Sequence, residues 1–79
     1  MGICEFTLKE TLDRLEITPN QLAVEAKIRP ASIYDMYKNK STRIHLTTLA
    51  RVIDALNSIL VEKGIKEEIV IEDIITYKK

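Results

Sequence analysis

The chain has 79 residues, 46% of them hydrophobic, and its 12 basic and 12 acidic residues cancel to a net charge of zero. We expect a single domain, residues 1–79, whose apolar content supplies a core if the chain is mostly helical. No apolar run approaches the roughly 18 residues of a membrane span and no signal peptide is recognisable, which argues against a membrane or secreted protein. Cys4 is alone, so an internal disulfide is excluded and a cytoplasmic location is expected.

The charge is distributed unevenly along the chain. Residues 27–51 carry six basic residues and one acidic residue, a local net charge of +5. Residues 1–26 carry two basic and five acidic residues, and residues 52–79 carry four basic and six acidic residues. A basic segment is usually a solvated surface, but it is also the footprint of a face that contacts DNA. With so few cations, non-specific DNA affinity should be modest and should fall readily as salt rises.

Spacing and capping signals predict the first two helices. The apolar residues Phe6, Leu8, Leu12 and Leu15 recur near helical spacing and predict an amphipathic helix over about residues 7–16. Thr18-Pro19 predicts the N-cap and first residue of a second helix, and Gln21 would complete a capping box. The inward side of this second helix is predicted to be Leu22, Ala23 and Ala26.

A break and a third helix follow. Arg29-Pro30 marks the boundary, because the residue before a proline avoids the α region and proline suits a first helical position. Residues 30–38 are predicted to be helical, with Tyr34 facing outward and an inward side of Ile33, Met36 and Tyr37. Asn39 suits a left-handed helix end. Residues 40–45 read as a polar, basic loop.

A long fourth helix is predicted from Leu46 or Thr47 to Lys63, ended by Gly64. Its core stripe comprises Leu46, Leu49, Ala50, Ile53, Leu56 and Leu60. A second apolar stripe requires a second partner, which is either another copy of the chain or the C-terminal segment of the same chain. If a second copy covers it, the candidate dimer interface is Val52, Ala55, Ile59, Ile69 and Val70.

The C-terminal segment, residues 57–79, is predicted to serve packing or dimerisation. Residues 69–71 are β-branched and favour a short strand, whereas residues 72–77 favour a final short helix or turn.

Several stretches in order and spacing resemble the Cro/phage-repressor (Xre-like) helix-turn-helix family. They are Thr18-Pro19-Asn20-Gln21-Leu22-Ala23, the apolar turn residue Ile28, residues 31–40 and residues 49–56, with Glu72-Asp73-Ile74-Ile75 resembling the closing helix. The resemblance implies an all-α, compact five-helix domain, to which the residue pattern itself adds an extended fourth helix and one possible short C-terminal strand. Its helix-turn-helix unit spans about residues 18–38.

In this family the start of the third helix reads DNA bases. By position, the resemblance implies a base-reading surface of Pro30, Ala31, Ser32, Tyr34, Asp35 and Lys38. Phosphate contacts would come from the start of the second helix and from the following loop, namely Thr18, Lys40, Ser41, Thr42 and Arg43.

Three features depart from the family pattern. Lys27 stands where the inter-helix turn usually has glycine, and lysine adopts positive φ only at some cost. The reading helix lacks the Gln, Asn or Arg of bidentate base pairs, so Asp35 would accept from a cytosine amino group and Ala31 would touch a thymine methyl. Residues 57–70 read as an insertion.

Two functions fit these features. The first is a small sequence-specific DNA-binding transcriptional regulator that acts as a homodimer on double-stranded DNA. The alternative is a protein-interaction module on the same scaffold, such as an anti-repressor, antitoxin or phage modulator without DNA binding. An enzyme fits poorly, because the sequence has no phosphate loop and no catalytic constellation, and His45 and Cys4 are each alone. We expect no metal and no cofactor.

Overall fold

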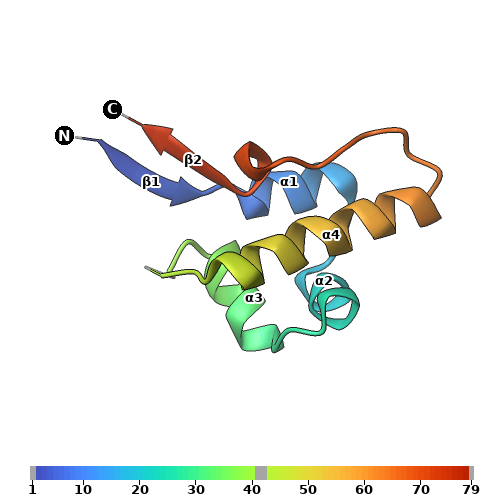
Figure 1. Ribbon diagram of the computed structural model, residues 1–79, viewed down its shortest axis with the longest axis horizontal. Coiled ribbons are helices and arrows are strands. Elements are labelled where there is room, and N and C mark those ends of the chain that lie inside the picture. Colours follow the sequence, from blue (N-terminus) through green and yellow to red (C-terminus); the bar gives the residue numbers. More distant parts are fainter. Residues whose placement is uncertain (1, 41–42, 79) are drawn as a thin grey trace.

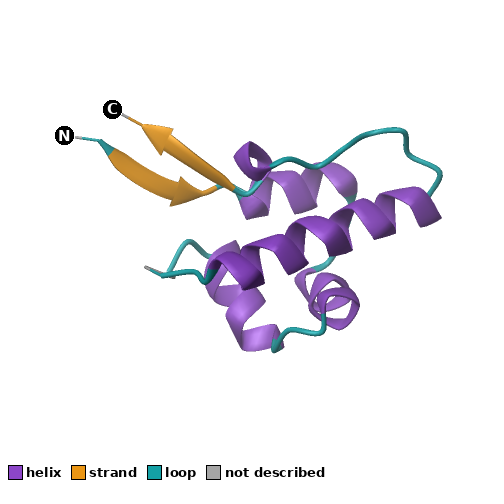
Figure 2. Cartoon of the chain, viewed as in Figure 1, coloured by secondary structure: helices purple, strands orange, loops and turns teal. Residues whose placement is uncertain are grey.

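The computed structural model of the protein describes residues 2–40 and 43–78. Within these residues the chain forms four α-helices, one 3-10 helix and a two-stranded sheet (Figure 2). The elements are β1 (Ile3–Phe6), α1 (Leu8–Leu15), α2 (Pro19–Ala26), α3 (Pro30–Tyr37), α4 (Leu46–Glu62), η1 (Ile71–Asp73) and β2 (Ile75–Lys78). The four predicted helices are confirmed, but the predicted fifth helix is not.

Helix α4 is the longest element and the other helices surround it (Figure 1). It packs against α2, and α2 in turn packs against α3. After α4 the chain runs back along the molecule to η1, beside α1, and ends in the sheet. The core between these elements contains the fully buried Leu12, Leu22, Ile33, Leu56 and Leu60. No helix in the described part of the chain is long and apolar enough to cross a membrane.

All four helices end in the same way. A residue in the left-handed conformation follows each helix: Glu16 (φ 57°), Lys27 (φ 58°), Asn39 (φ 57°) and Gly64 (φ 73°). The amide of the next residue then bonds a carbonyl five positions back, in the pairs Ile17–Leu12, Ile28–Ala23, Lys40–Asp35 and Ile65–Leu60. This is the Schellman motif, and it satisfies the carbonyls that a helix end leaves unpaired.

The structure corrects the prediction for the C-terminus. The strand lies at Ile75–Lys78 rather than at residues 69–71, and it pairs antiparallel with β1 in the register Ile3–Lys78 to Phe6–Ile75. The prediction of a closing helix in residues 72–77 is wrong, because the only helical turn in this part of the described chain is the 3-10 turn Ile71–Asp73. A four-residue strand acquires its backbone partners from the other end of the chain, which a local pattern does not reveal.

The backbone of residues 69–71 has partners other than a strand: the Val70 amide donates to Asp73 Oδ2, Ile71 begins η1, and Ile69 bonds a side chain. The amide of Ile69 donates to Asn57 Oδ1 at 2.8 Å, and Asn57 Nδ2 donates to the Ile69 carbonyl at 3.3 Å. Asn57 therefore pairs with the returning chain as a neighbouring strand would, and Ile69 is buried.

The core stripe of α4 is rotated from the predicted one. Leu49, Leu56 and Leu60 are buried and Ile53 packs against the core, as predicted. Leu46, at the start of the helix, and Ala50 are exposed, so their assignment to the core is wrong.

Candidate nucleic-acid interface

The start of α2 is fixed by the predicted cap. The Gln21 amide donates to Thr18 Oγ1 at 3.1 Å, and Pro19 occupies the first helical position. This bond is the first half of the predicted capping box; no return bond from Thr18 N–H to the Gln21 side chain is present among the described residues. The buried Leu22, Ala23 and Ala26 attach α2 to the rest of the molecule.

The turn between α2 and α3 keeps its helix-ending geometry without glycine. Lys27 adopts φ 58° and ψ 43°, and the Ile28 amide bonds the Ala23 carbonyl at 3.0 Å. A left-handed lysine costs about 1 kcal/mol relative to glycine. Ile28 packs against the core at the same point. Lysine at this position therefore raises the energy of the turn, while α2 still ends in the Schellman motif.

Helix α3 is attached by one side and exposed on the other. Ile33 is fully buried, Met36 is nearly so, and Tyr37 packs at the margin of the core. All six residues that the sequence assigned to base reading are exposed: Pro30, Ala31, Ser32, Tyr34, Asp35 and Lys38. Lys38 Nζ lies 5.9 Å from the centroid of the Tyr34 ring, an outward cation–π pair.

The loop after α3 lies beside this exposed side. Lys40 and Arg43 are exposed, whereas Ser41 and Thr42, also assigned to phosphate contacts, lie outside the described residues. Arg43 shares the lining of a groove of about 150 Å³ with Ser32 and Asp35 of α3, and with His45, the N-cap residue of α4. Candidate phosphate and base contacts thus adjoin across one groove.

In this arrangement a turn ends one helix and sets the next helix against it. The second helix is exposed and has cations at its end. This is the geometry that places a helix in the DNA major groove. A family model for the Cro/C1-type helix-turn-helix DNA-binding domain matches residues 7–62. The chain belongs to this Cro/C1-type family. Comparison with curated proteins and with solved structures found no significant match. The family identifies a DNA-binding regulator, with DNA as its partner.

The start of α2 in this Cro/C1-type domain has fewer free backbone amides for a phosphate than the sequence implied. The start of α2 was expected to offer free amides around Thr18, which is exposed. Pro19 has no N–H, and the Gln21 amide is already bound by the Thr18 hydroxyl. Within the first turn of α2, Asn20 therefore carries the amide that has no acceptor among the described residues, so an anion here would meet fewer backbone donors than at a helix start without these bonds.

The site assignment missed several exposed residues beside the predicted ones. Arg29 is the N-cap residue of α3 and is exposed, as are Asn20 and Gln21 in the first turn of α2. The sequence places Arg29 within the basic segment, but the family resemblance implies no base or phosphate contact for it. Asn20 and Gln21 carry side-chain carboxamides, which can pair with a base edge and which the reading helix α3 itself lacks.

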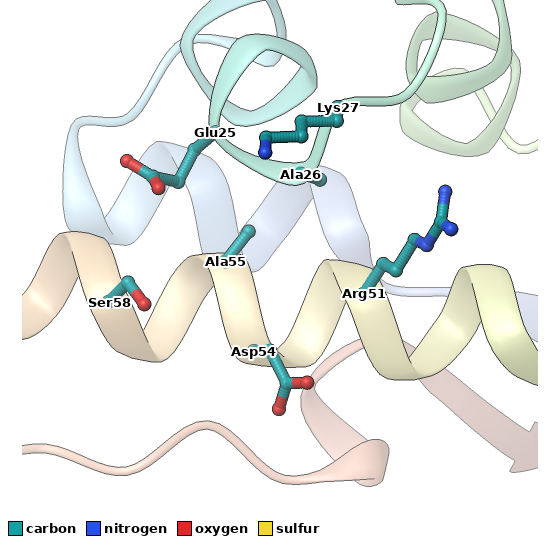
Figure 3. Close-up of a pocket in the computed structure, with 7 residues that line it drawn as sticks. All are labelled: Glu25, Ala26, Lys27, Arg51, Asp54, Ala55 and Ser58. Carbon is teal, nitrogen blue, oxygen red and sulfur yellow. The ribbon is translucent and has the colours of Figure 1, made fainter.

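The basic segment divides between two surfaces. Lys38, Lys40 and Arg43 lie around the end of α3, whereas Arg51 lies on α4. There, Lys27 and Arg51 line a separate depression of about 320 Å³, with Ala26 and Ala55 between α2 and α4 (Figure 3). None of the residues assigned to base reading lines this depression. The local charge of +5 therefore overstates the charge at the reading surface.

The candidate dimer interface needs correction. Val52, Ala55, Ile59 and Ile69 are buried within the chain, with at most 5% of each exposed, and Val70 is 45% exposed. A second copy would have to open the core to reach the first four. The second apolar stripe of α4 is buried by the chain's own elements, which was the alternative left open by the sequence.

Proposed function

We propose that the chain is a sequence-specific transcriptional repressor that inserts α3 into the major groove of double-stranded DNA and acts by occupying a promoter, without a catalytic step. The observation that carries the proposal is the exposed row of five residues on α3 and its C-cap residue Lys38, flanked by Lys40 and Arg43. Family membership supports DNA as the partner.

The chemistry of that row limits the sequence it would select. Asp35 only accepts hydrogen bonds, so the base edge it favours is the amino group of cytosine. Ala31 suits the methyl group of thymine, while Ser32 tolerates either a donor or an acceptor. Selection of bound duplexes from a random pool at moderate salt, followed by sequencing, tests this preference directly.

We further propose that the repressor acts as a homodimer on a pseudo-palindrome. Two half-sites separated by about one helical turn in the selected sequences would support it, since paired reading helices are spaced in this way. A single enriched half-site would indicate a monomer. No enriched sequence would refute sequence-specific binding and favour a protein-interaction module on the same scaffold.

The contribution of the loop is tested with Lys40→Glu/Arg43→Glu. We expect this double variant to lose binding while keeping its helical circular dichroism, because reversed charges repel the phosphates. Arg51→Glu/Lys66→Glu is the matched control, since it changes the net charge equally at exposed positions away from α3. Equal loss in both variants would show that overall charge, rather than this loop, governs binding.

A further inference from the structure

The end of α3 differs from the other three helix ends in how it is anchored. At the ends of α1, α2 and α4, the residue after the left-handed position is an isoleucine that is buried or packed against the core: Ile17, Ile28 and Ile65. Such an apolar contact commonly accompanies this motif. At the end of α3 the corresponding residue is Lys40, which is exposed. The end of α3 therefore carries an exposed lysine at the position where the other helix ends have an apolar residue that anchors them to the core.

Asn39 supplies a different anchor. Its backbone adopts φ 57° and closes the helix, with the Lys40 amide bound to the Asp35 carbonyl at 2.8 Å. Its side chain reaches a distant segment, because Asn39 Oδ1 accepts the Phe6 amide at 3.0 Å. Glycine would fit the left-handed backbone at lower cost but would make no such bond.

The bond crosses a region that apolar packing leaves open. A depression of about 350 Å³ separates the end of α3 from β1 and the start of α1, and both Phe6 and Asn39 line it. A second side-chain hydrogen bond joins the end of α3 to α1, from Tyr37 Oη to Asp13 Oδ1 at 2.9 Å. Besides the packing of Met36 and Tyr37 against the core, two polar contacts therefore hold this end of α3.

Phe6 also belongs to the sheet that joins the two ends of the chain. It is the last residue of β1 and pairs with Ile75 of β2. In Figure 1 the sheet and the loop that follows α3 lie toward the same end of the molecule. The Asn39–Phe6 bond thus connects the terminal sheet to the segment that carries Lys38 and Lys40.

We propose that Asn39 is a positioning residue that ties the terminal sheet to the end of α3 and so presents Lys38 to the DNA bases and Lys40 to a DNA phosphate. This rests on the proposed function, because it assigns those lysines to DNA. It adds that residues remote from the helix-turn-helix unit control its phosphate contacts.

The test compares Asn39→Gly with the wild type on the selected duplex. Glycine keeps the left-handed backbone and removes the acceptor, so the helix should remain. We expect about three- to tenfold weaker binding, the range of one ordinary hydrogen bond. We also expect the slope of log affinity against log salt to fall by about 1, as for the loss of one phosphate contact. A role in stability alone would leave that slope unchanged.

Glu16→Gly is the matched control, because it makes the same backbone change at the end of α1, which Ile17 anchors. We expect it to keep the wild-type salt slope. Amide hydrogen exchange gives a second readout: the Phe6 amide should exchange faster in Asn39→Gly and stay protected in Asn39→Asp, which retains an acceptor.

The outcomes separate the two proposals. A wild-type chain that binds no duplex would refute the proposed function and, with it, the DNA role of Asn39. Wild-type binding with an unchanged affinity and salt slope in Asn39→Gly would overturn the positioning role alone. Unchanged exchange at Phe6 in that variant would overturn the anchor itself, whatever the DNA result.

Discussion

The hydrogen bonds of the helix-turn-helix unit and those of the C-terminal third of the chain differ in how far apart in the sequence their partners lie. The helix-turn-helix unit is closed by contacts between near neighbours, such as the Gln21 amide with Thr18 and the Ile28 amide with Ala23. The C-terminal third is held by bonds to distant segments: Thr11 Oγ1 donates to the Asp73 carbonyl, 62 positions away, at 2.6 Å.

Further long-range bonds hold the returning segment. Lys63 Nζ donates to the carbonyls of Leu15 and Glu16, each at 3.4 Å, and Arg14 forms an ion pair with Glu67. Closing loops of this length costs chain entropy before the contact forms. The helix-turn-helix unit is therefore closed largely by bonds between near neighbours, whereas the C-terminal segment gains its bonds only when distant parts of the chain come together. Variants in each region test this difference.

The largest expected effect comes from Ile33→Ala, in the centre of α3. Ile33 is fully buried, so truncation removes apolar contacts and leaves a cavity that costs about 2–5 kcal/mol of unfolding free energy. Urea unfolding measures this change. Val24→Ala is the control, because Val24 is 71% exposed and should lose little. Equal losses would show that α3 is not anchored through Ile33.

The next largest effect is expected from Asn57→Ala, which tests the long-range region. It leaves the Ile69 amide and carbonyl without their side-chain partner, and unsatisfied buried groups cost about 1–3 kcal/mol. Urea unfolding and amide exchange at Ile69 check it, with the exposed neighbour Ser58→Ala as control. A stable variant with a protected Ile69 amide would mean that Asn57 is dispensable for the returning segment.

A smaller effect is expected from Thr18→Ala at the local unit. The N-cap bond to the Gln21 amide is lost, which costs about 1 kcal/mol. Thr18→Ser keeps the hydroxyl and should restore most of the stability, as thermal unfolding would reveal. If serine fails to rescue, the methyl group rather than the cap accounts for the loss.

The smallest effect concerns the pH dependence of the Tyr37–Asp13 contact. The hydrogen bond to Asp13 is the main cause that raises the pKa of Tyr37 above 10.0, with lesser contributions from burial and from the charges of Asp13 and Tyr34. A raised pKa means that the contribution to stability is fully present below pH 10 and is lost as the pH rises through the folded value. The stability difference between wild type and Tyr37→Phe should therefore shrink above about pH 10. A constant difference in urea unfolding from about pH 8 to about pH 11 would contradict the assignment.

The local signals predicted the candidate site well. Thr18, Pro30 and Asn39 mark helix boundaries that the structure confirms, and the Tyr34–Tyr37 pair faces outward and inward as expected. The family membership confirms the resemblance. The base and phosphate contacts themselves remain predictions. The exposed position of Arg29 at the start of α3 follows from the structure, whereas the sequence shows only that it belongs to the basic segment.

The sequence by itself determined the helices, their ends and the exposed side of α3, because caps, left-handed residues and the 3.6-residue period act over a few positions. The tertiary structure decided the remainder: what covers the second apolar stripe of α4, and where the two strands near the chain ends pair. It also decided that Asn39 bonds the Phe6 amide, 33 residues away. Those outcomes depend on partners brought together by folding, and a pattern within one segment carries no information about a partner from another.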